Sequence, residues 1–182
     1  DLVTLMIILS DNTAANMCVD LVSIDYVNKI NKEFGLAKTV LGRKFAGLFY
    51  DPKIVEGGRD NFSSAGDMMR TLSLIAKKEI LNEELCNLAI DIMCRTQFTN
   101  GILRYLPREL TSSSAPFGPH KVAHKYGSIP GICNDVGIVF LEKRPYVICV
   151  LTKEVADLDG WDKVAQISKI AYDYFYRISR YP

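Results

Sequence analysis

The chain has 182 residues, 48% of them hydrophobic and 24% charged, which is the composition of an ordinary globular protein with a single core. Its 22 basic and 21 acidic residues leave a net charge of +1, so no basic stripe indicates nucleic acid as a partner. The longest apolar runs, such as residues 5–9 and 146–151, are too short to span a bilayer.

Five cysteines are spread along the chain without the spacing of a metal site: Cys18, Cys86, Cys94, Cys133 and Cys149. An odd number leaves at least one free thiol unless two chains are joined through it. Four of the five lie within apolar patterns, so we expect buried, unreactive thiols. This favours a reducing environment over a disulfide-stapled exported domain, and no residue pattern predicts a cofactor.

Residues 1–35 predict three short helices. The first has one apolar face, formed by Leu2, Leu5, Met6 and Leu9. Residues 10–12 interrupt this pattern, and a second helix is expected to turn three side chains inward, namely Met17, Cys18 and Leu21. Ser23 is a candidate N-cap for the third helix, which Gly35 would end. Its expected buried residues are Ile24, Val27, Ile30 and Phe34.

Residues 36–62 show no sustained period, which predicts a long irregular connection of the kind that is usually functional or mobile. Two further helices follow. Ser64 and Asp67 form an S-x-x-D start for the first of them, whose expected inward residues are Met68, Leu72 and Ile75. Asn82 is expected to cap the second. Its expected inward residues are Leu85, Leu88, Ala89 and Ile92. Residues 111–119 are rich in Ser and Pro and predict an exposed loop.

After residue 120 the pattern changes to short β-branched or aromatic runs. Three of these predict strands, at residues 121–126, 137–141 and 146–151. A closing helix is expected from about Trp161 to Ser179, with an apolar stripe formed by Val164, Ile167, Ala171, Phe175 and Ile178. Helices followed by an antiparallel strand trio and a final helix predict an α+β fold. We expect one domain over residues 1–182, mainly helical at 1–110 and with the sheet and closing helix at 120–182.

Two motifs carry chemistry when they are taken together. S-D-N at residues 10–12 lies at a break between helices, where each of its residues would also make an ordinary helix cap. H-K-Y-G-S at residues 124–128 lies on a predicted strand, where a glycine lets a ligand approach the backbone. We expect Lys125 and Asn12 to face one cleft.

In this order the two motifs resemble the S-D-N and K-T-G elements of class A β-lactamases and penicillin-binding proteins. Residues 5–16 resemble that family's helix–S-D-N–helix segment, and residues 34–44 resemble the stretch that leads into its omega loop. Residues 104–107, 122–125 and 134–139 resemble the run into and out of its third sheet strand. The resemblance is collinear and covers nearly the whole chain.

The resemblance implies a role for each matched residue. Ser10 would pass a proton between the reacting centre and a lysine of the family's S-x-x-K motif. Asn12 would hydrogen-bond the amide of an acyl substrate, and Lys125 would attract the substrate carboxylate. The backbone N–H of Ser128 would form half of an oxyanion hole, next to Gly127 where the substrate approaches the strand.

Three departures limit what carries over from the family. No S-x-x-K occurs in these residues, so the nucleophilic serine and its lysine are expected upstream of Asp1. Tyr126 stands at the substrate-binding position where the family usually has Thr or Ser, and it replaces a small hydroxyl with a bulky phenol. The omega-loop signature E-x-x-L-N is missing, and Glu56, the only glutamate in that loop, is the candidate deacylation base.

Several other residues have structural rather than catalytic interpretations. His124 is expected to point away from Lys125 as a packed core histidine, and His120 is expected in solvent. Trp161 is expected in the core. Asp135 is assigned to a turn, with fixing of the strand pair as the alternative. A series of aromatic residues is expected to pack against the sheet: Tyr172, Tyr174, Phe175, Tyr176 and Tyr181.

The first functional hypothesis is therefore a serine hydrolase of class A β-lactamase type, acting on β-lactam or peptidoglycan-like substrates through an acyl-enzyme. Without its nucleophile, this chain alone is expected to be inactive. Because the deacylation glutamate is not found, a penicillin-binding, DD-peptidase-like or esterase-like activity is a variant. The alternative from another class is an inactive module that binds cell-wall peptides.

The resemblance also implies an incomplete sheet. The family places two strands ahead of S-D-N, so the three strands of this chain would leave an edge and an apolar face exposed. We expect the missing part as a second chain, a further segment or a dimer partner. The family resemblance implies an extracytoplasmic or cell-surface bacterial location.

Overall fold

The structure, a computed structural model, describes residues 1–45, 60–112 and 120–181. The helices are α1 (Leu2–Ile8), α2 (Asn12–Val22), α3 (Ile24–Glu33), α4 (Ala65–Ala76), α5 (Glu83–Met93), α6 (Arg108–Thr111) and α7 (Asp157–Ser179). The strands are β1 (Val122–Ile129), β2 (Ile132–Val139) and β3 (Tyr146–Val150), which form an antiparallel sheet in the order β1-β2-β3. The α+β class predicted from the sequence is confirmed.

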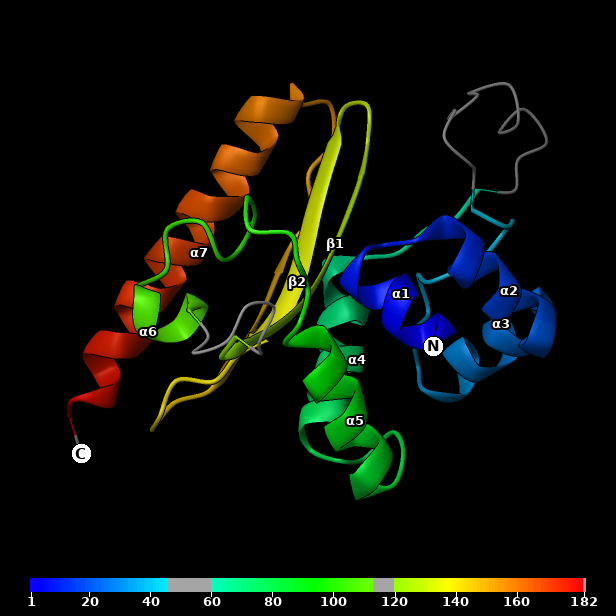
Figure 1. The fold of residues 1–182 in the computed structure, drawn as a ribbon, viewed down its shortest axis with the longest axis horizontal. Helices are drawn as coiled ribbons and strands as arrows, with labels where there is room; N and C mark the ends of the chain where they lie inside the picture. Colours follow the sequence, from blue (N-terminus) through cyan, green and yellow to red (C-terminus); the bar gives the residue numbers. More distant parts are fainter. Residues whose placement is uncertain (46–59, 113–119, 182) are drawn as a thin grey trace.

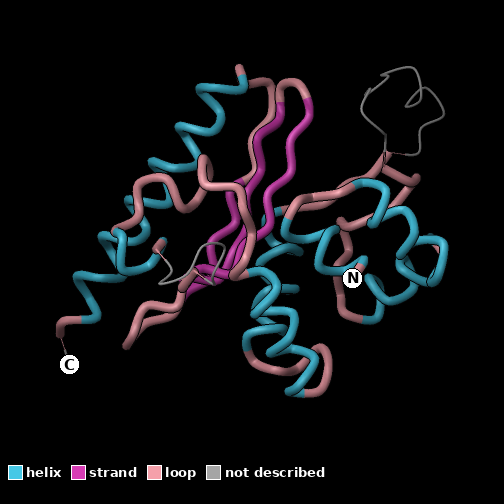
Figure 2. The backbone as a smooth tube through the Cα atoms, in the orientation of Figure 1, coloured by secondary structure: helices cyan, strands magenta, loops and turns pink. Residues whose placement is uncertain are grey.

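The sheet lies between two helical layers (Figure 1), α4 and α5 on one face and α7 on the other. α1, α2 and α3 form a separate helical part beside the sheet, as the backbone trace also shows (Figure 2). Successive side chains along each strand point to opposite faces of the sheet, so the strands contribute apolar residues to the cores on both faces. Val122 and Ile148 pack toward α7, whereas Ala123 and Val136 pack toward α4 and α5. Among the described residues, no helix is long and apolar enough to cross a membrane.

The three predicted N-caps are confirmed. Ser23, Ser64 and Asn82 begin α3, α4 and α5, and each side chain accepts a hydrogen bond of 2.9–3.2 Å from the backbone N–H three residues later. These bonds satisfy N–H groups that the first turn of a helix leaves unpaired. Gly35 follows α3 with φ +71°, a conformation in which a side chain would be strained, and so ends the helix as predicted.

The predicted inward face of α2 is wrong. Ala14, Ala15 and Val19 are the buried residues, whereas Met17 is exposed and Leu21 is 79% exposed. α2 packs against α1 and α3. Small side chains let neighbouring helices lie close together, so the larger apolar residues are left on the outside.

The predicted inward faces of α5 and α7 are confirmed only in part: Ile92 and Val164 are buried as expected, but other large apolar residues are exposed. Leu85 and Leu88 of α5 are exposed, and the buried residues are Cys86, Ile92 and Met93. Ile167 of α7 is exposed, and the buried residues include Gly160, Ala165 and Ser168. A Cβ at Gly160 would meet the Cys133 Sγ at 2.8 Å, which shows how closely the first turn of α7 approaches β2.

The β1–β2 hairpin is longer than predicted. Pairing runs from Val122↔Val139 to Ile129↔Ile132, and the chain reverses at Gly131, whose φ of +82° suits glycine. Residues 132–136 were predicted to lie outside a strand, so the assignment of Asp135 to a turn is wrong. Asp135 lies within β2 opposite Tyr126 and is fully buried.

Cysteine burial agrees with expectation for three of the five thiols. Cys86, Cys94 and Cys133 are buried, Cys18 and Cys149 are half-buried, and all five are free. Burial raises the pKa of Cys94 and of Cys149 to about 11. Thiolate is therefore rare at these two positions near neutral pH.

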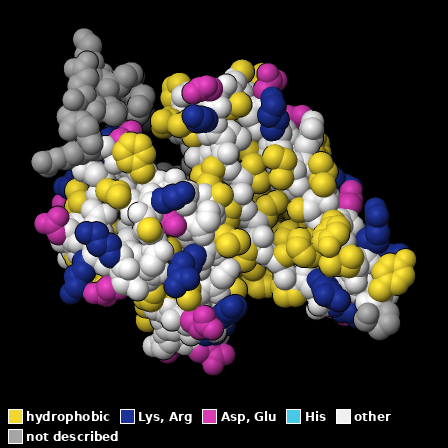
Figure 3. Space-filling model, turned by 180° about the vertical axis from the view of Figure 1, so that it is seen from behind, with side chains coloured by type: hydrophobic (Ala, Val, Ile, Leu, Met, Phe, Trp, Pro, Cys, Tyr) yellow, Lys and Arg dark blue, Asp and Glu magenta, His cyan; other side chains and the backbone are white. Residues whose placement is uncertain are grey.

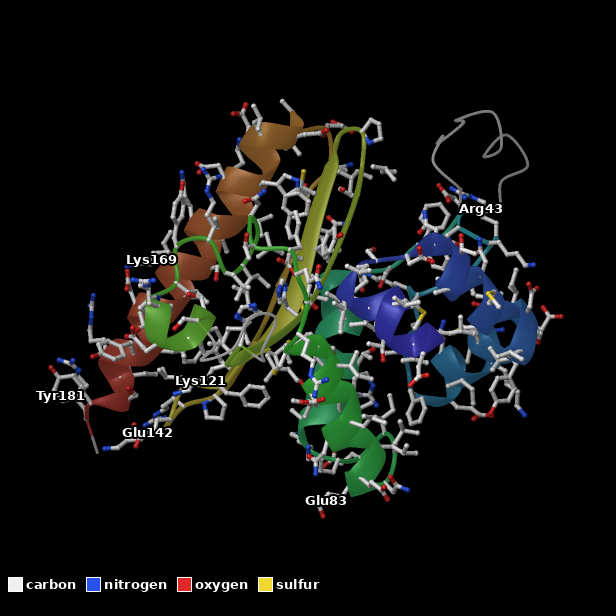
Figure 4. All side chains as sticks on the ribbon, viewed as in Figure 1. Arg43, Glu83, Lys121, Glu142, Lys169 and Tyr181 are labelled. Atoms are coloured by element: carbon white, nitrogen blue, oxygen red, sulfur yellow. The ribbon has the colours of Figure 1, made fainter. Side chains whose placement is uncertain are left out.

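The aromatic series at the end of the chain divides between core and surface. Tyr172 is buried, and the ring of Phe175 stacks on Tyr146 with the centroids 4.3 Å apart. Tyr174 is 58% exposed and Tyr176 is also exposed, so the expectation that they pack on the sheet is wrong. Figure 4 shows Tyr181 at the free end of α7, where the helix has run past the sheet.

The prediction that His120 lies in solvent is wrong. It is half-buried, and its backbone N–H donates to the carbonyl of Cys94 at 2.7 Å, which holds the segment against the end of α5. Burial lowers the pKa of His120, because the charged imidazolium would lose hydration.

Candidate active site

A cleft of about 670 Å³ lies between the α1–α2 turn and the β1–β2 hairpin. Its lining includes six residues that the sequence predicted for the site: Ser10, Asn12, Lys125, Tyr126, Gly127 and Ser128. The helical part contributes the S-D-N residues and β1 contributes the others, so the two motifs meet in one cleft. Glu56, the candidate deacylation base, lies outside the described residues.

Ser10 occupies a constrained position between α1 and α2. Its φ of +56° is unusual for a residue with a side chain. The next residue, Asp11, begins α2 and accepts a hydrogen bond from the N–H of Ala14 at 2.6 Å. A backbone that is strained by roughly 1–2 kcal/mol is maintained where the surroundings over-determine it, and such positions cluster at functional sites. In this conformation Ser10 Oγ lies against the Lys125 ammonium.

Lys125 is the polar centre of the cleft. It alternates with His124 along β1 and therefore faces the helical part, where its Nζ donates to Ser10 Oγ at 2.7 Å. Nζ also donates to the backbone carbonyl of Tyr126 and lies 4.6 Å from the centre of the Tyr126 ring. Burial lowers the pKa of Lys125 from 10.5 to about 8, and the negative charge of Asp135 opposes that shift.

A buried polar network lies behind Lys125 on the other face of β1. Asp135 and His124 are fully buried, with His124 Nδ1 and Asp135 Oδ1 2.9 Å apart. The other oxygen of Asp135 accepts from the N–H of Ile102 at 2.9 Å, and Thr96 donates to the carbonyl of His124 at 2.7 Å. The core position predicted for His124 is confirmed. The alternative given for Asp135, fixing of the strand pair, is the one that the structure supports, since Asp135 of β2 contacts His124 of β1. That His124 is its partner was not predicted, because the two residues are brought together by a hairpin register that the pattern did not reveal.

An aromatic cluster borders the same edge of β1. The rings of Tyr126 and Phe98 stack with centroids 4.1 Å apart and an interplanar angle of 17°. Trp161 follows at 4.5 Å from Phe98 and packs against the core, as predicted. The hydroxyl of Tyr126 donates to the carbonyl of Leu9 at 3.5 Å, a long hydrogen bond. The contribution of Phe98 was not predicted, since it lies in a segment without periodicity.

The opposite wall of the cleft contains Phe45 and an ion pair. Asn16 of α2 bonds both backbone groups of Phe45, accepting from its N–H at 2.8 Å and donating to its carbonyl at 3.0 Å. Arg43 pairs with Asp60 at 2.9 Å, and Figure 4 shows Arg43 at the outer end of the helical part. Asn61 accepts from the N–H groups of residues 42 and 43. Arg43 lies in the stretch that resembles the entry to the omega loop, but no sequence pattern predicted these contacts.

Comparison with known proteins identifies the fold and the family. The sequence model of the beta-lactamase enzyme family matches residues 1–175. The chain belongs to the beta-lactamase enzyme family. The resemblance read from the S-D-N and H-K-Y-G-S motifs is therefore confirmed at the level of the family.

Solved structures of this family superimpose on almost the whole chain. A β-lactamase from Sphaerobacter thermophilus is similar with a TM-score of 0.83 and 26% identity, over 98% of this chain and 63% of that one. PBP-A is similar with a TM-score of 0.78 and 27% identity, over 97% of this chain and 60% of that one. A class A β-lactamase from Bacteroides cellulosilyticus is similar with a TM-score of 0.75 and 26% identity, over 94% and 61%. The chain thus spans about 60% of the length of these structures, and a comparison with curated proteins finds no match.

The described residues of the cleft indicate which chemistry it can support. A Cβ at Gly127 would meet no atom within 4 Å, so a ligand can approach β1 from that side. Among the described residues, no cluster of His, Cys, Asp or Glu side chains could hold a metal ion. The chemistry that the described residues offer is proton transfer at Ser10 and Lys125 and hydrogen bonding along β1.

Proposed function

We propose that this chain is part of a serine hydrolase of class A β-lactamase type, which opens amide or lactam bonds through an acyl-enzyme. The observation that supports this most directly is the 2.7 Å contact of Lys125 Nζ with Ser10 Oγ inside a cleft that Asn12 and Ser128 also line. The nucleophile belongs to an S-x-x-K serine, a motif that the sequence lacks. Residues 1–182 form a single, partial domain.

Ser10 is the proton carrier in this proposal. When the amide bond of the substrate breaks, the leaving nitrogen takes the proton from Ser10 Oγ, and the Lys125 ammonium stabilises the resulting oxygen charge and returns a proton. The backbone N–H of Ser128 stabilises the negative oxygen of the tetrahedral intermediate, where fixed donors contribute most to catalysis. Asn12 holds the acyl side chain of the substrate.

Deacylation is the slow step of this reaction. Two described carboxylates line the cleft, and both have structural partners: Asp11 caps α2, and Asp60 pairs with Arg43. Phe45, whose backbone N–H donates to Asn16, adds an apolar residue to the lining of the cleft. Glu56 remains the candidate base. These observations favour a penicillin-binding, DD-peptidase-like or esterase-like variant with a long-lived acyl-enzyme.

The test uses the intact protein that contains the S-x-x-K segment. After exposure to benzylpenicillin, mass spectrometry measures the covalent adduct and its lifetime, and nitrocefin hydrolysis measures turnover. Ser10→Ala is expected to slow adduct formation by about 100-fold or more, the usual contribution of a positioned proton carrier. Ser179→Ala, on the far end of α7, is the matched control and is expected to leave the rate unchanged.

The outcomes separate the candidates. A short-lived adduct with nitrocefin turnover indicates a β-lactamase, and a persistent adduct indicates a penicillin-binding enzyme. No adduct with either benzylpenicillin or the neutral acyl donor p-nitrophenyl acetate, with an intact protein that still binds peptide, would refute the hydrolase and support the inactive cell-wall-peptide module. Tyr126, which replaces a small hydroxyl in the cleft, is the observation that favours that second candidate.

We further propose that the sheet is completed along β3 by another segment, a second chain or a dimer partner. Among the described residues β3 pairs with β2 alone, which leaves its other edge open. α7 beside it exposes several apolar side chains, among them Leu158, Ile170 and Tyr174. Seen from behind (Figure 3), apolar side chains gather over the half with the sheet and α7, whereas charges are mixed over the helical half. A purified 182-residue chain that stayed monomeric in light scattering, with a sharp melting transition, would contradict this.

A further inference from the structure

The Lys125 ammonium has a complete set of partners within the protein. An ammonium group carries three N–H donors and no acceptor. Two of the donors go to oxygen atoms, Ser10 Oγ at 2.7 Å and the carbonyl of Tyr126. The Tyr126 ring is a third neighbour of the ammonium, with its centre 4.6 Å from Nζ and within the range of a cation–π contact.

Tyr126 is fixed in the position that makes this third contact. Its ring is held between the Lys125 ammonium and the stacked ring of Phe98, 4.1 Å away. Its hydroxyl is directed to the carbonyl of Leu9 at 3.5 Å, at the end of α1. The phenol therefore spans from β1 to the helical part, and its O–H is engaged with the protein rather than directed at a ligand.

These contacts occupy the Lys125 donors and the Tyr126 hydroxyl that would otherwise bind a substrate carboxylate. We infer that the cleft selects acyl compounds without a carboxylate, namely neutral esters or amides, because Tyr126 occupies the anion-binding side of Lys125. The inference rests on the proposed acyl-transfer function, since it concerns the substrate class of that same site. Tyr126 is thus a specificity-determining residue.

The burial of Lys125 agrees with this assignment. Burial lowers the pKa of Lys125 to about 8, so its charge is weakly hydrated and depends on the partners within the protein. A lysine that recruits anions from solvent would instead present donors to water. Lys125 is better suited to exchange a proton with Ser10 than to attract a substrate charge.

The experiment compares a matched pair of probes on the intact protein with its S-x-x-K serine replaced by alanine, so that neither probe is consumed during the titration. N-acetylalanine and its methyl ester, in the same configuration, share the amide and differ in whether a carboxylate is present. Dissociation constants measured by NMR titration give the acid-to-ester preference. The wild-type protein is expected to bind the ester at least as tightly as the acid.

Two substitutions isolate the part that Tyr126 plays. Tyr126→Thr frees one donor of Lys125 and adds a small hydroxyl, so the preference for the acid is expected to rise about tenfold, equivalent to 1.4 kcal/mol. Tyr126→Phe keeps the ring over the ammonium and is expected to retain the wild-type preference. Circular dichroism establishes that both variants are folded.

Three results would overturn the inference: a tenfold wild-type preference for the acid, equal shifts for the two variants, or binding of neither probe. Adduct formation is scored separately, on the protein with its nucleophile intact, with the neutral acyl donor p-nitrophenyl acetate, because benzylpenicillin carries the carboxylate that the inference excludes. If the proposed acyl-transfer function fails, no adduct forms in any variant, while the acid-to-ester preference still reports on Tyr126. If the inference alone fails, adducts form but the wild-type cleft prefers the acid.

Discussion

Fully buried side chains such as Ile102, Ile138 and Val164 fill the space around the sheet, whereas α1 and α3, every residue of which is described, contain no buried residue. The helical part is held instead by polar side chains that bond the backbone of distant segments. Asn28 of α3 bonds both backbone groups of Leu41 at 2.8 Å, as Asn16 does for Phe45. The cleft lies between these two kinds of structure.

This difference between the apolar packing around the sheet and the polar contacts of the helical part indicates that the two walls of the cleft differ in rigidity. Lys125 projects from β1 next to the closely packed core, where small displacements are costly, and Gly127 and Ser128 follow toward the exposed end of that strand. Ser10 and Asn12 project from a part with few buried apolar contacts, which is where local opening is cheapest. Binding of an acyl ligand is therefore expected to order the helical wall more than the sheet wall.

The largest expected effect lies in the sheet part, at Gly101. A Cβ at this position would clash with the carboxylate of Asp135, which is fully buried and bonded to Ile102 and His124. Gly101→Ala is expected to lower the free energy of unfolding by about 3 kcal/mol, measured by urea denaturation, because the network cannot move aside. Gly66→Ala in α4, where a Cβ meets only Ser64 Oγ at 3.9 Å, is the control and should not destabilise. A small loss for Gly101→Ala would show that the sheet wall is adaptable after all.

The next effect lies at the junction of the two parts, at Lys125. Its pKa is lowered from 10.5 to about 8 in the folded chain, so the unfolded chain holds this proton more tightly. Between about pH 8 and pH 10 the unfolded state then binds more protons, and the free energy of unfolding is expected to rise by roughly 2 kcal/mol from this group. Lys125→Met removes the group, so the difference between the two unfolding curves across this range isolates it. A difference that stays flat with pH would contradict the burial of the ammonium.

A smaller and more local effect is expected in the helical part. Asn28→Ala removes both bonds to Leu41 and should cost about 1.5 kcal/mol, because two backbone groups lose their partner. Hydrogen exchange is expected to accelerate in α3 and near residues 39–42, while β2 keeps its protection. The exposed Asn87→Ala on α5 serves as the control. Faster exchange throughout the sheet would mean that the two parts unfold as one unit.

The smallest effect is expected at the cap of α4, in the helical layer that covers one face of the sheet. Ser64→Ala removes the bond to the N–H of Asp67 and should lower stability by about 1 kcal/mol. Ser64→Gly should cost only a few tenths, since glycine leaves the N–H open to water. Thermal melting of the two variants checks the order, and an equal loss would assign the effect to something other than the cap.

Local chemistry explains which features the sequence predicted. The caps at Ser23, Ser64 and Asn82 and the end at Gly35 depend on a few neighbouring residues, so each could be read directly. Two short motifs likewise identified the lining of the cleft. Their chemical roles remain predictions.

Tertiary packing explains which features the sequence could not give. The predicted inward face of α2 was wrong and that of α5 only partly right, because close approach favoured Ala15 and Cys86 over the larger Leu21 and Leu88. The buried pairing of His124 with Asp135 depends on hairpin register. The stacking of Phe98 on Tyr126 depends on where an aperiodic segment crosses β1, which no local pattern specifies.

The free thiols and the single tryptophan allow the width of the cleft to be followed by fluorescence energy transfer. Alkylation at neutral pH is expected to be slow at Cys94 and Cys149, whose pKa values are raised to about 11, and slow at the buried Cys86 and Cys133. A maleimide acceptor should therefore attach first to Cys18, half-exposed on α2 in the helical wall. Trp161 emits from the sheet side as the only tryptophan, so energy transfer to that acceptor would follow changes in cleft width without any mutation.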